Sequence, residues 1–142
     1  MRVALKINAL FFDQKTVRSA TDRATRKVLS KFGAFVRTAA RSSIRRRKNV
    51  SEPGQPPSSH VGTLRRLIFF GFDPTKRSVV VGPTPFGNKA EAPELLEYGG
   101  RARRKSRRGR IQAATYRPRP FMGPAFERER PKLIPMWADS VK

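Results

Sequence analysis

The feature that most constrains the fold is a helical pattern without proline that runs from residue 13 to about residue 47. About 35 residues at 1.5 Å each would make a helix roughly 50 Å long, which exceeds what a domain of this size can cover. We therefore expect one end of the helix to project or to meet a neighbouring molecule. The apolar and small residues that recur at three- and four-residue spacing are Val17, Ala20, Ala24, Val28, Phe32, Phe35, Ala39 and Ser43.

Gly33 lies inside this helical pattern. Glycine in a helix interior costs up to about 1 kcal/mol relative to alanine. The residue therefore indicates a bend, a close crossing by another element, or simply a tolerated glycine.

Residues 49–60 hold three prolines, a glycine and several small polar residues, a composition that predicts a proline-rich loop. Residues 64–72 and 78–81 are rich in aromatic and branched side chains and predict the two strands of a β-hairpin. Large apolar residues alternate onto both faces of the first strand, so we expect it to be covered on both sides.

Residues 92–98 predict a short helix that Pro93 opens and the pair Gly99 and Gly100 closes. Glu91, Glu94 and Glu97 fall three residues apart, a spacing that brings carboxylates together on a helix. They could bind a hard cation. In so basic a chain, partners for arginines within or between subunits are the favoured interpretation.

The chain carries 32 Lys and Arg against 10 Asp and Glu, a formal net charge of +22. Such an excess predicts a polyanionic neighbour. Nucleic acid is favoured, while membrane headgroups and an acidic protein stay open. The end of the long helix is one concentration of cations, and residues 101–110, with seven cations in ten, are another. The candidate contacts to DNA or to an acidic partner are Arg45, Arg46, Arg47, Arg101, Arg103, Arg104, Lys105, Arg107, Arg108 and Arg110.

Residues 99–110 contain no apolar residue larger than alanine, so the segment alone cannot offset the entropy of ordering. We expect a basic flexible loop or arm before a strand at residues 111–117. The segment has no aromatic residue on which bases could stack, and the chain has no motif for reading base sequence. Any DNA contact is therefore expected to be to the phosphate backbone.

Catalytic chemistry has little support in the sequence. The chain has no cysteine and one histidine, His60, so neither thiolate nor histidine metal clusters can form. A hydrolase built on Ser59 and His60 is disfavoured because neighbouring residues do not make a triad. No glycine-rich phosphate loop is present. We expect no enzyme, no metal and no cofactor. No signal peptide or spanning segment is recognised, so no membrane association is expected.

Residues 118–126, with the sequence PRPFMGPAF, predict rigid turns followed by a helix that begins near residues 123–125. Pro131 and Pro135 should divide this C-terminal helix into two pieces. Aromatic and methionine side chains concentrate at interface cores, although an ordinary domain core explains Phe121, Met122 and Phe126 equally well. The candidate interface residues are Leu95, Leu96, Tyr98, Phe121, Met122 and Phe126.

Four ordered blocks together resemble a known family. The first is PGQPP at residues 53–57 leading to His60, Gly62 and Leu64, and the second is VVVGP at residues 79–83. The third is LLEYGG at residues 95–100, and the fourth is the 118–126 segment. The chain resembles the small head-to-tail connector family, the neck and tail-completion proteins of long-tailed double-stranded DNA phages. Many relatives have a shorter turn in place of residues 101–110, so no role of that segment carries over.

The resemblance implies a structural virion protein in a single α+β domain over residues 1–142. A long N-terminal helix would pack on a small antiparallel or mixed sheet, with a short helix, the basic arm and a C-terminal helix. It also implies a homo-oligomeric ring at the head–tail junction, a hexamer in preference to a dodecamer. The expected partners are head-completion or connector proteins, tail-terminator or tail-tube proteins, and genomic DNA.

Such a virion protein would be assembled in the host cytoplasm. Copies of a +22 subunit placed side by side repel one another, so the ring should depend on acidic neighbours or on DNA. The alternative function is an architectural DNA-binding protein without sequence specificity, for which the charge alone is sufficient motivation.

Overall fold

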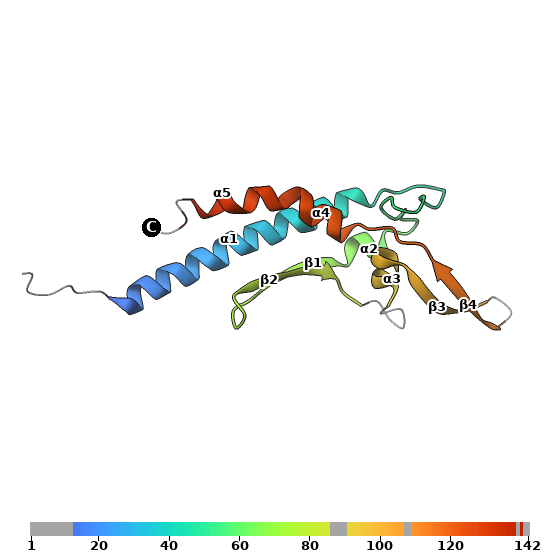
Figure 1. The fold of residues 1–142 in the computed structure, drawn as a ribbon, viewed down its shortest axis with the longest axis horizontal. Helices are drawn as coiled ribbons and strands as arrows, with labels where there is room; N and C mark the ends of the chain where they lie inside the picture. The colour runs from blue at the N-terminus through green and yellow to red at the C-terminus, as the bar shows by residue number, and fades with distance from the viewer. Residues whose placement is uncertain (1–12, 86–90, 107–108, 139, 141–142) are drawn as a thin grey trace, which may run out of the picture.

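The computed structural model describes residues 13–85, 91–106, 109–138 and 140 (Figure 1). Its longest element is α1, Gln14–Ser43. The carboxylate of Asp13 caps the helix by accepting from the backbone N–H groups of Lys15 and Thr16, each at 3.1 Å. The helix ends four residues before the predicted end, because Ile44 turns to an extended conformation and is only 1% exposed. Residues 45–47 therefore follow the helix.

The fold is α+β, as predicted, with α1 lying between two layers (Figure 1). On one side the C-terminal segment runs back along α1 as α4, Met122–Glu129, then the 3₁₀ turn η1, Arg130–Lys132, then α5, Leu133–Trp137. On the other side lies the hairpin of β1, Ile68–Asp73, and β2, Ser78–Pro83. The division of the C-terminal helix into two pieces is confirmed at Pro131, whereas Pro135 lies inside α5 and does not interrupt it.

The strands form two separate two-stranded sheets. The second hairpin consists of β3, Gly100–Lys105, and β4, Ile111–Tyr116, in antiparallel register. This corrects the prediction of a flexible loop over residues 99–110, since its first part is a strand. The basic sequence of residues 101–110 alone cannot offset the entropy lost on ordering. In the fold, however, β4 pairs with β3 along its whole length. The short helix α3, Ala92–Tyr98, has its predicted bounds.

The predicted first strand begins later than expected. Residues 63–66 form a helical turn, α2, Thr63–Arg66, and the strand starts at Ile68. Gly62, with φ of 86°, precedes the turn, and this left-handed conformation is one that glycine adopts without strain. Leu64 packs against the core cluster from α2. The apolar run in the sequence thus spans a helix and a strand.

The β1–β2 hairpin contacts α1 through one face only. A Cβ atom at Gly33 would lie 2.6 Å from Cγ2 of Val79 and 3.1 Å from Cδ2 of Phe70, so the glycine marks a close crossing. The opposite face of the hairpin carries Phe69 and Val80, which are 47% and 66% exposed. The expectation that β1 is covered on both sides is therefore wrong for the single chain.

Replacing Gly33 with alanine should lower the free energy of unfolding by about 1 to 2 kcal/mol, because overpacking against Val79 outweighs the better helix propensity of alanine. Gly71→Ala is the matched control, since a Cβ atom there meets nothing within 4 Å. Urea unfolding of both variants measures the difference. Equal or greater stability of the Gly33 variant would show that the crossing is not tight.

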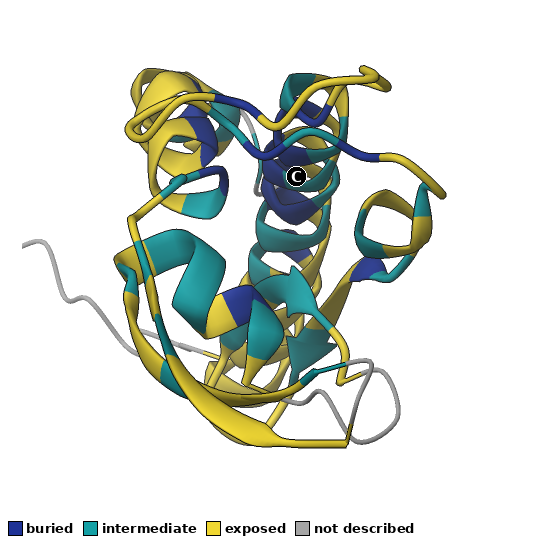
Figure 2. Cartoon of the chain, turned by 90° about the vertical axis from the view of Figure 1, so that its right-hand side faces the viewer, coloured by how far each residue is buried: buried dark blue, intermediate teal, exposed yellow. Residues whose placement is uncertain are grey.

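The core lies where α1, β1 and α4 meet. Its buried members are Ala39, Ala40, Ile44, Ile68, Phe121 and Ala125, and Leu64, Leu96 and Met122 pack against them. Alanines on both helices let α1 and α4 approach closely, which leaves room for one large ring, that of Phe121. Figure 2 shows buried residues concentrated along α1 and its neighbours, while both hairpins are largely half-buried or exposed.

Glu129 ties α4 to the turn that follows it. Its side chain is 5% exposed and accepts from Lys132 Nζ at 2.5 Å and from Arg128 Nε at 3.1 Å. The hydrogen bond from Lys132 holds the pKa of Glu129 below its ordinary value of 4.5; burial opposes this shift and Arg128 reinforces it. The stabilisation is therefore complete above pH 4.5 and is lost as the pH falls through the lower pKa of the folded state.

The variant Glu129→Gln should be less stable than the parent protein by about 1 to 3 kcal/mol at pH 7, and the gap should narrow as the pH falls below 4.5. Thermal melting between pH 3 and pH 7 measures it. The control Glu127→Gln removes a carboxylate that is 58% exposed and pairs with Arg130, so its effect should be small throughout. A gap for Glu129→Gln that stays constant down to pH 3 would contradict the assignment.

Candidate functional site

The β3–β4 hairpin is largely exposed. It projects past the C-terminal end of α1 (Figure 1) and its main contact outside itself is with α3. All of β3 except Ala102 is exposed. In Figure 2 the end that carries this hairpin faces the viewer, and the hairpin is coloured mostly as exposed. A two-stranded ribbon with so few contacts is marginally stable alone.

The register of the hairpin gathers positive charge on one face. Arg101, Arg103 and Lys105 alternate along β3, so they share a face. Their partners on β4 are Thr115, Ala113 and Ile111, none of which is charged. No ion pair involves these cations within the part of the chain that the structure describes. The face can therefore bind a row of phosphates or carboxylates.

Other predicted basic residues of this region are placed differently. Arg104 lies on the opposite face of β3, across from Gln112. Arg110 is exposed at the base of the turn, where its carbonyl accepts from Ser106 N–H at 2.8 Å. Arg107 and Arg108 lie outside the described residues. The predicted continuous basic segment is therefore divided in the structure. Arg101, Arg103 and Lys105 share one face of β3, Arg104 lies on the other face, and Arg110 lies at the turn.

The hairpin is held at its base by residues 118–123, which we call the junction. The carbonyl of Pro118 accepts from Gly54 N–H at 2.9 Å, and Arg119 N–H donates to the carbonyl of Leu96 at 2.6 Å. Gly99, at φ of 74°, is so close to Tyr116 and Pro118 that a Cβ atom would lie 2.9 Å from the Tyr116 carbonyl oxygen. Glycine is therefore required where α3 passes into β3.

Glu97 joins α3 to the start of α4. Its Oε2 accepts from the backbone N–H groups of Phe121 at 2.8 Å and Met122 at 3.0 Å, and its Oε1 from that of Gly123 at 2.7 Å. A carboxylate is favoured at a helix N-terminus, where backbone donors are free and the macrodipole is positive. The predicted grouping of three glutamates therefore does not hold, because Glu97 binds backbone within the fold while Glu91 and Glu94 stay exposed.

A second basic surface lies beside the end of α1, around an open pocket of about 590 Å³. Arg41 and Arg46 line it together with Arg65 and Arg66 of α2, and His60 also contributes. No carboxylate of the described residues lines this pocket. Of the predicted arginine cluster, Arg45 and Arg47 are exposed but do not line the pocket. The part played by α2 was missed because Leu64–Arg66 was interpreted as strand.

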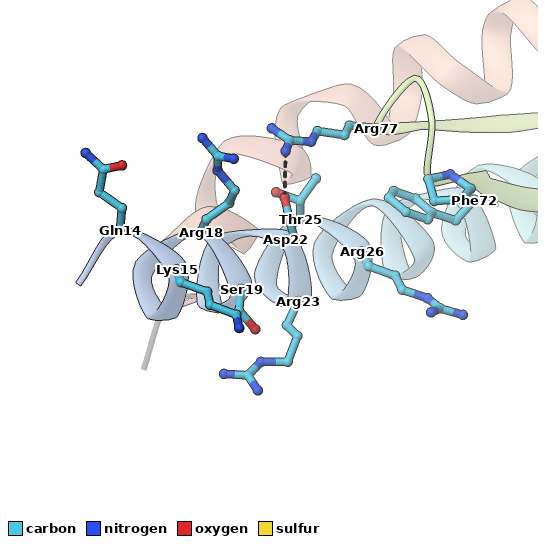
Figure 3. Close-up of a pocket in the computed structure, with 11 residues that line it drawn as sticks. Gln14, Lys15, Arg18, Ser19, Asp22, Arg23, Thr25, Arg26, Phe72 and Arg77 are labelled. Atoms are coloured by element: carbon cyan, nitrogen blue, oxygen red, sulfur yellow. Dashed lines mark ion pairs between the residues drawn. The ribbon is translucent and has the colours of Figure 1, made fainter.

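A third basic surface is a groove of about 990 Å³ between the N-terminal half of α1 and the β1–β2 turn (Figure 3). Arg18 and Arg26 on α1 and Arg77 from the turn contribute charge, beside the ring of Phe72. Arg77 reaches across to Asp22 and pairs with it at 3.1 Å, as Figure 3 shows. The sequence signal that could have found this groove is the recurrence of Arg18, Asp22 and Arg26 at four-residue spacing, which places them on one face of α1.

The candidate interface residues divide into three groups by exposure. Phe121 is 1% exposed and belongs to the core of the single chain, which favours the core interpretation for it. Tyr98 and Phe126 are 77% and 42% exposed, and Phe126 packs edge to face on Phe32 with ring centroids 5.9 Å apart. The half-buried remainder of the set is Leu95, Leu96 and Met122.

Groups suited to catalysis are sparse in the described part of the chain. Ser59 and His60 both line the basic pocket beside α1, but no acidic residue lines it to orient the imidazole. Among the described residues, no group of three His, Cys, Asp or Glu could hold a metal ion. No helix in the described ranges is long and apolar enough to cross a membrane.

Comparisons of the chain with protein-family models, with curated proteins and with solved structures find no match.

Proposed function

We propose that the chain is a structural subunit of the head–tail junction of a long-tailed double-stranded DNA phage, where copies form a ring between the DNA-filled head and the tail. The observation that carries the proposal is the amount of surface that a single copy leaves uncovered. Among the described residues, large apolar side chains stay exposed on both the β1–β2 hairpin and the helical layer, including Phe69 at 47%, Val80 at 66% and Ile134 at 80%. So much uncovered apolar surface suits a subunit that buries this surface against neighbouring subunits.

The uncovered surface has the composition of an assembly surface. The outer face of the β1–β2 hairpin presents Phe69 and Val80, and the helical layer presents Ile134 and Trp137. Large exposed apolar side chains gathered on several faces mark contact sites. The basic face of β3–β4 adds a surface for DNA or for an acidic protein.

The four blocks of the resemblance have a shared structural role that supports the proposal. The Pro-rich loop, α3 and the junction bond to one another through Gly54, Leu96, Glu97 and Pro118. The remaining block supplies Val79, which packs at Gly33. The first set of contacts holds the base of the basic hairpin, and the contact at Gly33 holds the β1–β2 hairpin on α1. Repeated copies would therefore present the hairpin at the same angle, as a ring requires.

The test is electron microscopy of particles made without this chain, from the genome that encodes it. We expect DNA-filled heads and separate, complete tails that fail to join. Restoring the chain in trans should restore joined particles, which controls for effects on neighbouring genes. Fully joined and infectious particles in its absence would refute the proposal.

A second function, architectural binding of duplex DNA, is favoured by the basic face of β3. It requires tight binding by the isolated chain with a steep dependence on salt. Replacing Arg101, Arg103 and Lys105 with alanine should then lower the slope of log binding constant against log salt by about 2 to 3. Removing three exposed cations elsewhere, Lys27, Lys31 and Lys76, is the charge-matched control. Equal slopes for the two variants, or binding no tighter than that of a polycationic peptide of equal charge, would exclude this function.

A further inference from the structure

Six of the nine acidic residues that the structure describes are engaged within the fold. Asp13 caps α1, Asp22 pairs with Arg77, and Asp73 accepts from Thr75 N–H at 2.9 Å in the β1–β2 turn. Glu97 binds the start of α4, and the two carboxylates at its end pair with neighbouring cations. The three described carboxylates without an internal partner are Glu52, in the Pro-rich loop, and Glu91 and Glu94.

Two of these carboxylates lie at the start of α3, Glu91 as its N-cap residue and Glu94 in its first turn. Glu91 and Glu94 are exposed, and neither side chain forms a hydrogen bond or an ion pair with another described residue. Tyr98 follows at the spacing that places it on the same helix face, and it is 77% exposed. This acidic face, Glu91, Glu94 and Tyr98, presents two negative charges and one aromatic ring to the outside.

The groove in Figure 3 has the complementary chemistry. Five cations line it, and its one carboxylate, that of Asp22, is already paired with Arg77. Arg18, Asp22, Arg26 and Gly33 recur at intervals of four and seven residues, so they share one face of α1. At Gly33 this face of α1 packs on the β1–β2 hairpin. Nearer the N-terminus of α1, the same face lines the groove.

The two surfaces lie at different ends of the chain. The groove is near the N-terminal end of α1, whereas α3 lies toward the end that carries β3–β4 (Figure 1). A single copy cannot bring its own α3 into its own groove without unfolding. Two different surfaces that meet between identical copies make a heterologous, head-to-tail contact, and such a contact closes into a ring when its rotation allows.

We propose that the acidic face of α3 in one copy docks into the arginine groove of the next copy, as the repeating contact of the assembly. Glu91 and Glu94 pair with Arg18 and Arg26, while the ring of Tyr98 lies against Phe72 and the neighbouring guanidinium groups. The inference rests on the proposed ring-forming role and adds which surfaces of the chain meet. It also explains how a subunit of such high charge contacts itself, because the contact uses its few free acids.

The test reverses the charges of one surface, and then of both surfaces together so that they can pair again. The measured quantity is the fraction of heads that are joined to tails. Glu91→Lys with Glu94→Lys, and separately Arg18→Glu with Arg26→Glu, should each lower this fraction at least about tenfold, since like charges then face each other. A chain carrying all four substitutions has the parent net charge and re-pairs the two surfaces. Joined particles should recover to within about threefold of the parent level.

The control combines Glu91→Lys and Glu94→Lys with Lys27→Glu and Lys31→Glu, two exposed cations on another face of α1. It has the same net charge as the compensated chain and should not recover. Loss of joining from the groove substitutions alone, with no effect of the α3 substitutions, would assign the groove to another partner and overturn the inference. Failure of the four-substitution chain to recover would overturn it as well. In both cases joining still requires the chain, whereas joining without the chain would overturn the proposed function itself.

Discussion

Phe121→Ala is expected to lower the free energy of unfolding by about 3 to 5 kcal/mol, the cost of removing a large buried ring from a core. The side chain is 1% exposed and packs between α1 and β1, where Ile44 and Ile68 are buried with it. Its neighbours in the core include the alanines at positions 39, 40 and 125, which have no longer side chain that could turn into the cavity. A loss of this size is a large part of the stability of a domain this small.

The matched control is Phe126→Ala, five residues further along the chain and within α4. Phe126 is 42% exposed and keeps one edge-to-face contact, with Phe32, so its loss should cost about 1 to 2 kcal/mol. Denaturant unfolding of the purified chain compares the two variants. If Phe121→Ala unfolded like the parent protein but failed to assemble, Phe121 would be an interface residue after all.

Glu97→Ala is expected to cost about 2 to 4 kcal/mol, because three backbone N–H groups at the start of α4 lose their charged acceptor together. The effect should extend beyond α4, since the same carboxylate ties α3 to the junction. Glu97→Gln keeps an acceptor oxygen without the charge and should fall between the parent protein and the alanine variant.

The comparison for Glu97 is Glu94→Ala on the same helix. Glu94 is exposed and has no partner among the described residues, so the change should stay within about 0.5 kcal/mol. Hydrogen exchange at the amides of Phe121, Met122 and Gly123 adds a local readout, since their protection should fall in the Glu97 variant. Equal melting of the two alanine variants would show that the cap does not stabilise the fold.

Local signals in the sequence predicted the elements whose ends are determined by nearby residues. The period of apolar residues predicted α1, and Pro93 with Gly99 predicted the bounds of α3. The two-piece C-terminal helix followed from Pro131 in the same way. In each case the deciding interaction lies within a few residues of the element, where propensity and capping rules apply.

Elements that depend on distant partners could not be predicted in this way. β3 forms because β4 completes its ladder, although its own composition favours a loop. Glu97 meets backbone donors 24 to 26 residues further along the chain, and no spacing rule relates them. The groove between Arg18 and Arg77 likewise forms only when the β1–β2 turn packs beside α1. Such sites follow from the fold and not from a local motif.

The central claim, that copies of this chain form the ring that joins head to tail, is tested most directly by a particle reconstruction of that junction. The account predicts a ring of this chain between the head connector and the tail, with α3 of each copy against α1 of the next. Particles whose junction is complete without any density for this chain would contradict it.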